Sequence, residues 1–330
     1  MAEFLTFDTD LTAVANAIRV KGGTSAQLIY PSGFVSAIQA IQTGITPKLV
    51  VTTTPGAAIT ATPAEGFKVV KGTAGADGMC TLELPKAGTW HVTAMANSVS
   101  NSQHIVIGTQ NMLLPLYHDT FANNTWEEII TVCRTGIAPD SWAVGDSKTM
   151  NIGGTAYQVD IIGKNHDEYA DGSGTAPLTF QLHDCYSEAK QMYSTNLSGL
   201  GWKNTDMRLT YLPAILALMP AEVQNGIHAV NKKTSEGGNS TTIETVSDTL
   251  FLLSEVEIFG TASSSVAGEG SQYDYYKAGN PKIKKREGVD EFWWERSSAS
   301  GGMFCRVRAN GQAGASNASN SLGVSFAFCF

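Results

Sequence analysis

The end of the chain, residues 292–330, places two contrasting kinds of sequence side by side. An aromatic and ionic run, Phe-Trp-Trp-Glu-Arg-Ser, opens it at 292–297, and an apolar run closes it at 324–330. Between them, eighteen of the twenty-six residues of 297–322 are Ser, Ala, Gly or Asn. Bulky residues at both ends predict a packed frame. The small residues between them predict a surface whose side chains can be exchanged while the frame stays fixed.

The length and composition set limits on the rest of the fold. A chain of 330 residues predicts two or three domains, and 33 glycines with only 16% charged residues favour a β-rich structure with many turns. The net charge of -8 and the lack of a basic stripe argue against a nucleic-acid partner. The one basic run, 282–286, is expected to be solvated, in a loop or at a strand edge.

The sequence shows no secretory signal, because residues 1–10 have neither a basic start nor an apolar stretch. No segment approaches the ~20 apolar residues of a membrane span. We therefore expect that the protein does not insert into a membrane and that it is assembled in a cytoplasm. The five cysteines are odd in number and lack the spacing of metal ligands. They are expected to be buried free thiols rather than disulfides.

The first module, 1–44, is expected to be helical. Its first helix should follow Thr9 or Asp10 and stop at Gly22, and a second should follow residues 31–32 and end at Gly44. The apolar face of the first helix consists of Leu11, Val14, Ala15 and Ile18. Two short helices cannot bury a core alone, so this module should attach to a partner or to further copies of itself.

The second module, 45–115, shows the alternation of a half-buried strand. Cys80, Leu82 and Leu84 alternate with Thr81 and Glu83, and the spacing is repeated at Trp90, Val92 and Ala94. Turn signals recur about every ten residues, as in small antiparallel sandwiches. We expect an immunoglobulin-like β-sandwich that acts as a spacer.

The third module, 116–330, mixes helical and strand patterns and predicts one α+β domain. The expected elements are helices over 126–133, over 186–193 and from Pro213 to Met219, and strands over 155–162, 227–230 and 249–253. The segment 235–242 is expected to be a loose loop.

No sequence motif for catalysis or for phosphate binding is present. The clusters 166–168 and 183–185 contain metal-ligand residue types, but neighbours on a strand point to opposite faces, so surface positions are favoured. Glu255 and Glu257 would share one strand face, where a glycosidase could use them, although a structural ion pair is the favoured interpretation. We therefore expect no catalytic residue, no metal and no cofactor.

The pair Trp293-Trp294 could stack on sugars or lie in the core. The alternating phenylalanines at the end of the chain favour the core. Glu295 and Arg296 are then expected to pair with each other, buried or half-buried, at the entry to the small-residue region.

Two parts of the sequence resemble known families. Residues 10–19, 21–24, 30–31 and 33–38 resemble the start of many phage tail and tail-fibre proteins. The third module resembles the variable proteins of diversity-generating retroelements, in the phage branch that carries a C-type-lectin-like domain. The matching stretches are 145–146, 161–167, 201–204, 207–208, 250–260, 268–273, 293–297, 304–305, 307, 311, 318–319 and 323–326. Ser298 and Ala327 depart from the family, which usually has Pro and Gly at these positions.

In that family, template adenines are randomised as a copy is written into the end of the gene. Within 297–322, only Met303 and Gln312 lie outside the residues that a randomised asparagine codon can encode. The resemblance implies a variable ligand-binding face made of Ser298, Ala299, Ser300, Gly301, Gly302, Met303, Arg306, Arg308, Ala309, Asn310, Ala313, Gly314, Ala315, Ser316 and Leu322. It implies a structural frame made of Trp293, Trp294, Glu295, Arg296, Phe304, Cys305, Val307, Gly311, Gly323, Val324 and Phe326.

The resemblance further implies a receptor-binding protein of a phage tail-fibre tip, located in the virion tail. Its expected partners are a host cell-surface protein or glycan and other phage tail proteins, with a homotrimer as the assembly. Three alternatives stay open. They are a bacterial surface-displayed variable protein, a tail-borne glycan hydrolase using Glu255 and Glu257, and a structural tail protein whose end is only a turn-rich strand region.

Overall fold

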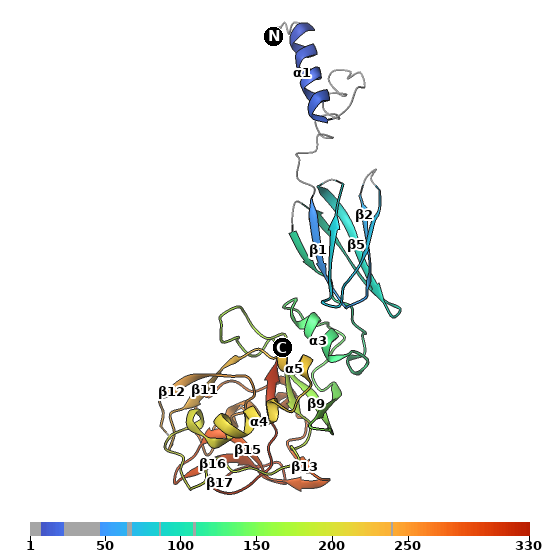
Figure 1. The fold of residues 1–330 in the computed structure, drawn as a ribbon. Helices are drawn as coiled ribbons and strands as arrows, with labels where there is room; N and C mark the ends of the chain where they lie inside the picture. Colours follow the sequence, from blue (N-terminus) through green and yellow to red (C-terminus); the bar gives the residue numbers. More distant parts are fainter. Residues whose placement is uncertain (1–7, 23–46, 65–67, 86, 108–109, 239) are drawn as a thin grey trace. The chain divides into compact units, whose positions relative to one another are not determined.

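The computed structural model describes residues 8–22, 47–64, 68–85, 87–107, 110–238 and 240–330 (Figure 1). The chain forms two compact units, Met1–Leu114 and Pro115–Phe330, and the division falls next to the expected boundary at residue 115. Both units consist mainly of strands, with few and short helices in the second unit. No helix of the described ranges is long and apolar enough to cross a membrane.

The first unit begins with helix α1, Asp8–Gly22. The helix ends at Gly22 as expected, but it starts before Thr9 and Asp10, which therefore lie in its first turn rather than at its cap. Ala15 and Ile18 are buried, whereas Val14 is largely exposed. The second expected helix of this module lies outside the described residues.

Within the described residues of this unit, seven strands in two sheets follow α1. One sheet has the order β4-β1-β7, with an antiparallel β4–β1 pair and a parallel β1–β7 pair. The other sheet has the order β3-β2-β5-β6 and is antiparallel throughout. The strand bounds are Lys48–Thr52 (β1), Ala58–Pro63 (β2), Val70–Thr73 (β3), Met79–Glu83 (β4), Gly88–Ala96 (β5), Val99–Ile107 (β6) and Gln110–Leu113 (β7). The predicted alternation is confirmed, because Leu82, Leu84, Trp90 and Val92 are buried.

A four-stranded antiparallel sheet, in the order β18-β10-β9-β8, forms the centre of the second unit. Its strands are Ser147–Ile152 (β8), Thr155–Lys164 (β9), Leu178–Leu182 (β10) and Ala327–Cys329 (β18). Helix α3, Trp126–Cys133, packs its aromatic start near the sheet, with the Trp126 and Phe180 ring centroids 5.9 Å apart. This helix and the long strand β9 were both expected.

The remaining strands form three small antiparallel sheets. They are the hairpin β11–β12 (Val230–Ser235, Ile243–Asp248), the hairpin β13–β14 (Lys284–Arg286, Val289–Glu291) and the sheet β15-β16-β17 (Trp293–Ser298, Met303–Val307, Ala313–Asn317). The short helices between them are η1 (Phe121–Asn123), η2 (Trp202–Asn204), η3 (Met207–Tyr211), α4 (Leu212–Leu216), α5 (Ala221–Gly226), α6 (Glu255–Phe259) and α7 (Asp274–Lys277).

Three expected elements are wrong. Residues 186–193 are not helical, because their main chain bonds to the end of the chain instead. The Tyr186 N–H donates to Val324 O at 2.8 Å, and the Met192 N–H donates to Ala318 O at 2.9 Å. The strand expected over 249–253 is reduced to one bridge between Phe251 and Ala327. Most of 227–230 precedes β11, which begins only at Val230.

The basic run 282–286 is also different from the expectation. Lys284 is buried, and its Nζ donates to the main-chain oxygens of Leu182 and His183 at 2.5 and 2.8 Å. Burial lowers the pKa of Lys284 to about 8. Lys284 is therefore packed inside the domain, whereas its immediate neighbours in the run are solvated.

A prediction follows from the start of α3. Thr125 accepts a hydrogen bond from the Glu128 N–H at 3.1 Å, and Glu128 accepts one from the Thr125 N–H at 2.8 Å, which is a complete capping box. Thr125→Ala should lower the free energy of unfolding by about 0.5–2 kcal/mol, measured by urea denaturation. The control is Thr131→Ala in the same helix, which should have little effect. Equal effects of the two substitutions would contradict the capping argument.

Candidate ligand-binding face

The sheet β15-β16-β17 carries most of the residues expected to form the variable face. Trp293, at the start of β15, pairs in register with Val307 of β16, and Phe304 of β16 pairs with Ser316 of β17. The β15–β16 register is interrupted between residues 294 and 298, so β15 bends there. The bend separates the aromatic start of the strand from the small residues that follow it.

The two tryptophans belong to the core, as expected. Both are fully buried, and their indole N–H groups donate to main-chain oxygens, Trp293 to Lys282 at 2.9 Å and Trp294 to Lys190 at 2.8 Å. Satisfied indole donors are typical of buried tryptophan. Neither ring can therefore stack on a sugar in this structure.

The other frame side chains are buried as well, and of the frame residues only Gly311 is half-buried. Phe304, Cys305, Val307, Val324 and Phe326 have no exposed surface. All five cysteines of the chain lie in the described ranges and are buried free thiols, as expected.

Two frame glycines are required by the backbone. A Cβ at Gly323 would lie 2.5 Å from Cys185 Sγ, and Gly311 has a φ of +81°, which disfavours other residues. Their place in the frame therefore follows from geometry and not only from burial.

Twelve of the fifteen expected face residues reach the surface. The exposed ones are Ser300, Gly301, Arg308 and Asn310. The half-buried ones are Gly302, Met303, Arg306, Ala309, Ala313, Ala315, Ser316 and Leu322. Because most of these side chains are small, the shape of the surface depends on the few larger ones.

Three expected face residues do not belong there. Ser298 and Ala299 are 1% and 2% exposed, and Gly314 is buried beneath Arg308, whose Nε would lie 2.8 Å from a Cβ at that position. The bend in β15 turns Ser298 and Ala299 inward. Gly302 reaches the surface but has a φ of +75°, and a Cβ there would lie 2.5 Å from Asn196 O. Substitution at Gly302 is therefore strained.

The face also includes a loop around Asn196 and Ser198 that no sequence pattern predicts there. Asn196 accepts a hydrogen bond from the Ser319 hydroxyl at 2.6 Å, and the Ser198 hydroxyl donates to Ala299 O at 2.8 Å. These contacts span more than a hundred residues, so no local pattern marks them. Asn317, Asn320 and Gln312 are exposed on the same segment and extend the face.

The arginines of the face are held in place by neutral partners. The Arg306 guanidinium lies 4.2 Å from the Phe292 ring centroid, and its Nε donates to Ala315 O at 3.2 Å. The Arg308 Nε donates to Ala313 O at 3.1 Å. No carboxylate forms an ion pair with either guanidinium within the described ranges. The exposed Arg308 therefore retains donors for a ligand, whereas Nη1 of the half-buried Arg306 is itself buried and has no partner.

Beneath the face, a row of four buried charges replaces the expected pair of Glu295 with Arg296. The partner of Arg296 is Glu257 of α6, with Nη2 2.9 Å from Oε1 and a second contact from Nη1 to Oε2. Lys232 of β11 lies 2.8 Å from Glu257 and 2.6 Å from Asp167. The charges alternate in sign along the row. Arg296 contacts Glu257, and Lys232 lies between Glu257 and Asp167.

Asp167 was expected at the surface but is 3% exposed. Burial alone raises the pKa of this carboxyl, but Lys232 and the Thr179 hydroxyl more than offset burial and hold the pKa at about 2. The Tyr273 hydroxyl donates to it at 2.9 Å. Asp167 is therefore an ionised structural group.

Glu255 and Glu257 lie on a helix and not on a strand. Ser254 caps α6, and Glu257 completes its capping box by accepting from the Ser254 N–H at 3.0 Å. Glu255 is fully buried and accepts from the N–H groups of Ser263, Ser264 and Ser265. Both carboxylates thus have structural partners, but the ion pair expected for these glutamates is found only for Glu257.

The second polar cluster also fails to converge on a metal. His183 is exposed and contacts Asp160 at 2.7 Å, whereas Cys185 is buried. Within the described ranges, no three His, Cys, Asp or Glu side chains are placed to hold one metal ion.

Glu295 is the one carboxyl of the region whose two oxygens both lack a hydrogen-bond partner within the described residues. Its burial and the nearby Glu255 and Glu269 raise the pKa of Glu295 well above its ordinary value. Burial therefore favours the protonated, neutral form of this side chain over its ionised form.

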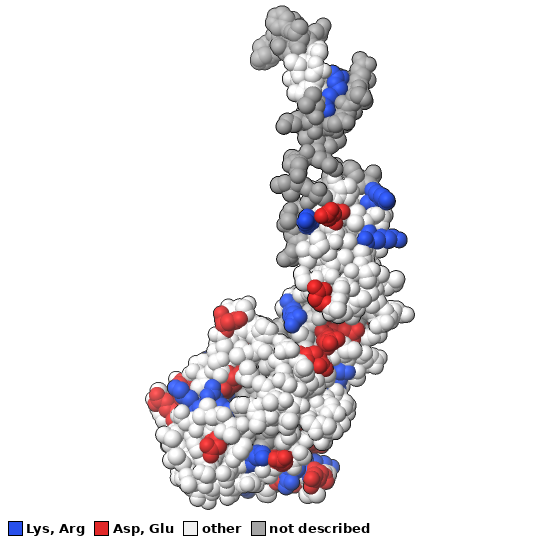
Figure 2. Space-filling model, in the orientation of Figure 1, with Lys and Arg blue, Asp and Glu red and all other residues white. Residues whose placement is uncertain are grey.

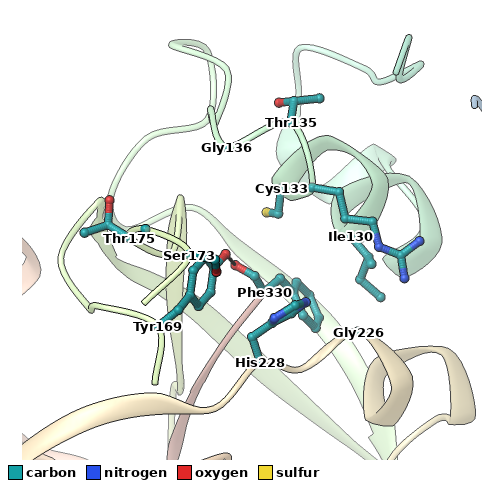
Figure 3. Close-up of a pocket in the computed structure, with 12 residues that line it drawn as sticks. Ile130, Cys133, Thr135, Gly136, Tyr169, Ser173, Thr175, Gly226, His228 and Phe330 are labelled. Carbon is teal, nitrogen blue, oxygen red and sulfur yellow. Dashed lines mark hydrogen bonds between the residues drawn. The ribbon is translucent and has the colours of Figure 1, made fainter. Parts of the chain in front are cut away.

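A separate cavity of about 520 Å³ lies between α3 and the loop after β9 (Figure 3). Cys133 and Ile130 of α3 line one side, and Tyr169 and His228 line the other, with ring centroids 5.1 Å apart. Burial raises the pKa of the Cys133 thiol, so it is not a ready nucleophile. Arg134 lies on the rim.

The surface charge is sparse. On the side seen in Figure 2, Lys and Arg are scattered among Asp and Glu and form no continuous basic stripe.

The buried charge row gives a prediction. Glu257→Gln removes one charge between two cations, so Arg296 and Lys232 lose their shared partner in a buried site. The free energy of unfolding should fall by about 3–5 kcal/mol, measured by chemical denaturation. Glu188→Gln, at an exposed ion pair with Lys190, should change it by about 0–1 kcal/mol. A loss for Glu257→Gln as small as that of the control would show that the row is not stabilising.

Glu295 gives a second prediction, on pH. Above the ordinary carboxyl pKa of 4.5 and below its raised pKa in the fold, Glu295 holds a proton that the unfolded chain releases. Its contribution to stability therefore falls as pH rises through this window. Glu295→Gln should match the wild type near pH 4 and become the more stable protein as pH rises, in melting curves. Parallel curves for both proteins across this range would contradict a raised pKa.

A protein-family model described as a domain of unknown function (DUF6273) matches residues 179–330. The match covers the sheet β15-β16-β17, Glu257 and Lys232, while Asp167 lies outside it. No curated protein and no solved structure matches the chain.

Proposed function

We propose that the protein is the receptor-binding protein of a phage tail-fibre tip, with a hypervariable face that binds ligands on the host surface. One observation carries the proposal: the segment rich in small residues lies at the surface, on a frame of fully buried side chains. Such a face can change its side chains while the core keeps its packing. The resemblance to variable proteins of diversity-generating retroelements supports the same proposal, because in that family the codons for such a face are randomised.

The finer fold assignments belong to the same proposal. The second unit would be a C-type-lectin-like domain, and the seven-stranded part of the first unit would be an immunoglobulin-like spacer. The helical module that includes α1 would attach to other tail proteins and form a homotrimer. Several copies on one virion would then raise a weak single-site affinity by avidity.

The ligand would be a host protein or glycan bound without a cofactor. Arg306 and Arg308 provide donors in fixed positions, and arginine is enriched at energetically dominant contacts. The exposed asparagines and serines around them provide adaptable hydrogen-bonding groups.

The decisive experiment is to sequence the DNA around the gene. The proposal expects a near-copy of the codons for residues 294–330, differing only at adenines, beside a reverse-transcriptase gene. The differing codons should fall at exposed and half-buried positions and avoid Trp293, Trp294 and Phe304. An intact locus without such a copy would reduce the protein to a fixed tail module. A copy among bacterial rather than phage genes would favour a surface-displayed variable protein.

A prediction concerns the face itself. The double substitution Arg308→Ser with Asn310→Ser removes two exposed side chains of the face. Binding of the purified protein to cells of the strain that adsorbs the phage should weaken by at least about fivefold, because truncating an arginine contact at a binding centre costs about 1 kcal/mol or more. The melting temperature should stay close to that of the wild type, because both residues are exposed.

The matched control for that measurement is Glu222→Ala, an exposed position of α5. It should leave cell binding unchanged. Unchanged binding of the Arg308 and Asn310 variant would remove this part of the face from the binding site.

A further inference from the structure

The two-sheet part of the first unit contains a histidine pair that a local reading of the sequence does not reveal. His91 lies on β5 and His104 on β6, opposite each other in register. Their imidazole centroids are 4.4 Å apart and their ring planes differ by 26°. Two of the six histidines of the chain are therefore stacked face to face.

The hairpin turn explains why these two residues meet. Asn97 and Ser98, between β5 and β6, have φ values of 48° and 67°, as in a two-residue turn whose central residues are both left-handed. The turn closes on the pair Ala96–Val99, and the register then runs without a shift to His91–His104. In such a hairpin the closing pair is hydrogen-bonded and the pairs alternate, so His91–His104 falls at a non-hydrogen-bonded position. Opposite side chains approach each other most closely at those positions.

Both imidazoles point away from the core. The neighbours Trp90 and Val92 are buried, so His91 lies on the opposite, outward face of β5, where it is half-buried, and His104 is exposed. Within the described ranges, neither imidazole forms a hydrogen bond to a side chain or an ion pair. Their ring nitrogens are therefore available to solvent and solutes.

We propose that His91 and His104 form a binding site for a divalent transition-metal ion, of the class Cu²⁺, Ni²⁺ or Zn²⁺. A neutral imidazole is the commonest metal ligand among side chains, and it binds these ions at about 2.0–2.1 Å. Rings stacked at 4.4 Å can direct one nitrogen each toward a shared ion by side-chain rotation. The other coordination positions would be filled by water.

The surroundings select the class of ion. Strands β2, β5 and β6 carry no Asp or Glu, and the outward residue opposite His91 on β2 is Thr62. Ca²⁺ and Mg²⁺ require several oxygen ligands, with carboxylates among them, so they should not bind. Nitrogen ligands alone favour the later first-row metals, with Cu²⁺ bound most tightly.

Binding would also have a structural consequence. β6 is the edge strand of its sheet, so it is paired on one side only. An ion shared by His91 and His104 would join the edge strand to β5 and stabilise the folded unit, because it binds the folded chain in preference to the unfolded one. This inference does not depend on the proposed receptor-binding function.

The test is titration of the full chain with Cu²⁺ and, separately, Zn²⁺, by calorimetry and by Cu²⁺ electron paramagnetic resonance. The expected result is one ion per chain with two nitrogen ligands, and a higher melting temperature in its presence. His91→Ala or His104→Ala should each weaken binding at least about tenfold. Each substitution removes one of two imidazoles that are held close together, so an ion bound to the remaining imidazole no longer finds a second one at high effective concentration. His104→Asn serves as a second variant of the exposed position if an alanine variant is poorly folded.

The control is His228→Ala, an exposed histidine of the second unit, which should bind as the wild type does. Mg²⁺ and Ca²⁺ should give no heat and no change in melting temperature. Equal binding by all histidine variants would mean adventitious association only, and no binding at millimolar Cu²⁺ would also overturn the proposal.

Discussion

The buried row of Arg296, Glu257, Lys232 and Asp167 is the interaction on which the second unit depends. The four residues come from β15, α6, β11 and the segment after β9, so the row joins elements that are distant in sequence. The Arg296 guanidinium also donates to three main-chain oxygens, those of Leu252, Lys233 and Glu269. Charges buried in this way are tolerated only when each has its partners. The row therefore holds β15 in place, and β15 pairs with β16, which carries part of the face.

The sequence alone predicts a structural feature correctly where the signal comes from neighbouring residues. The alternation around Cys80, Leu82 and Leu84, the helix that starts after Thr125, and the buried tryptophan pair all follow from neighbouring residues, and the structure has them. The contrast between bulky and small residues likewise separates the buried frame from the surface at most positions of 297–322. These features need no knowledge of what lies far away in the chain.

The sequence was insufficient where a distant partner decides. Adjacency suggested Glu295 as the partner of Arg296, but Glu257 takes that role, and Glu295 is left as a buried acid without a hydrogen-bond partner and with a raised pKa. The apolar spacing at 186–193 resembles a helix, but tertiary hydrogen bonds to the end of the chain hold it in turns. Nothing local marks Asn196 as a neighbour of Ser319. In each case a contact between distant segments overrides the local preference, which is a weak guide on its own.

The close approach of Gly302 to Asn196 limits what a diversified face can become. The glycine has a left-handed backbone and its α-carbon faces a main-chain oxygen, so an added side chain would push the loop 194–199 outward. Under the codon randomisation proposed above, changes at this position would yield mostly misfolded copies, which selection would remove. The usable repertoire is therefore smaller than the genetic repertoire, and a survey of natural variants should show glycine persisting at 302 while Ser300 and Asn310 change freely.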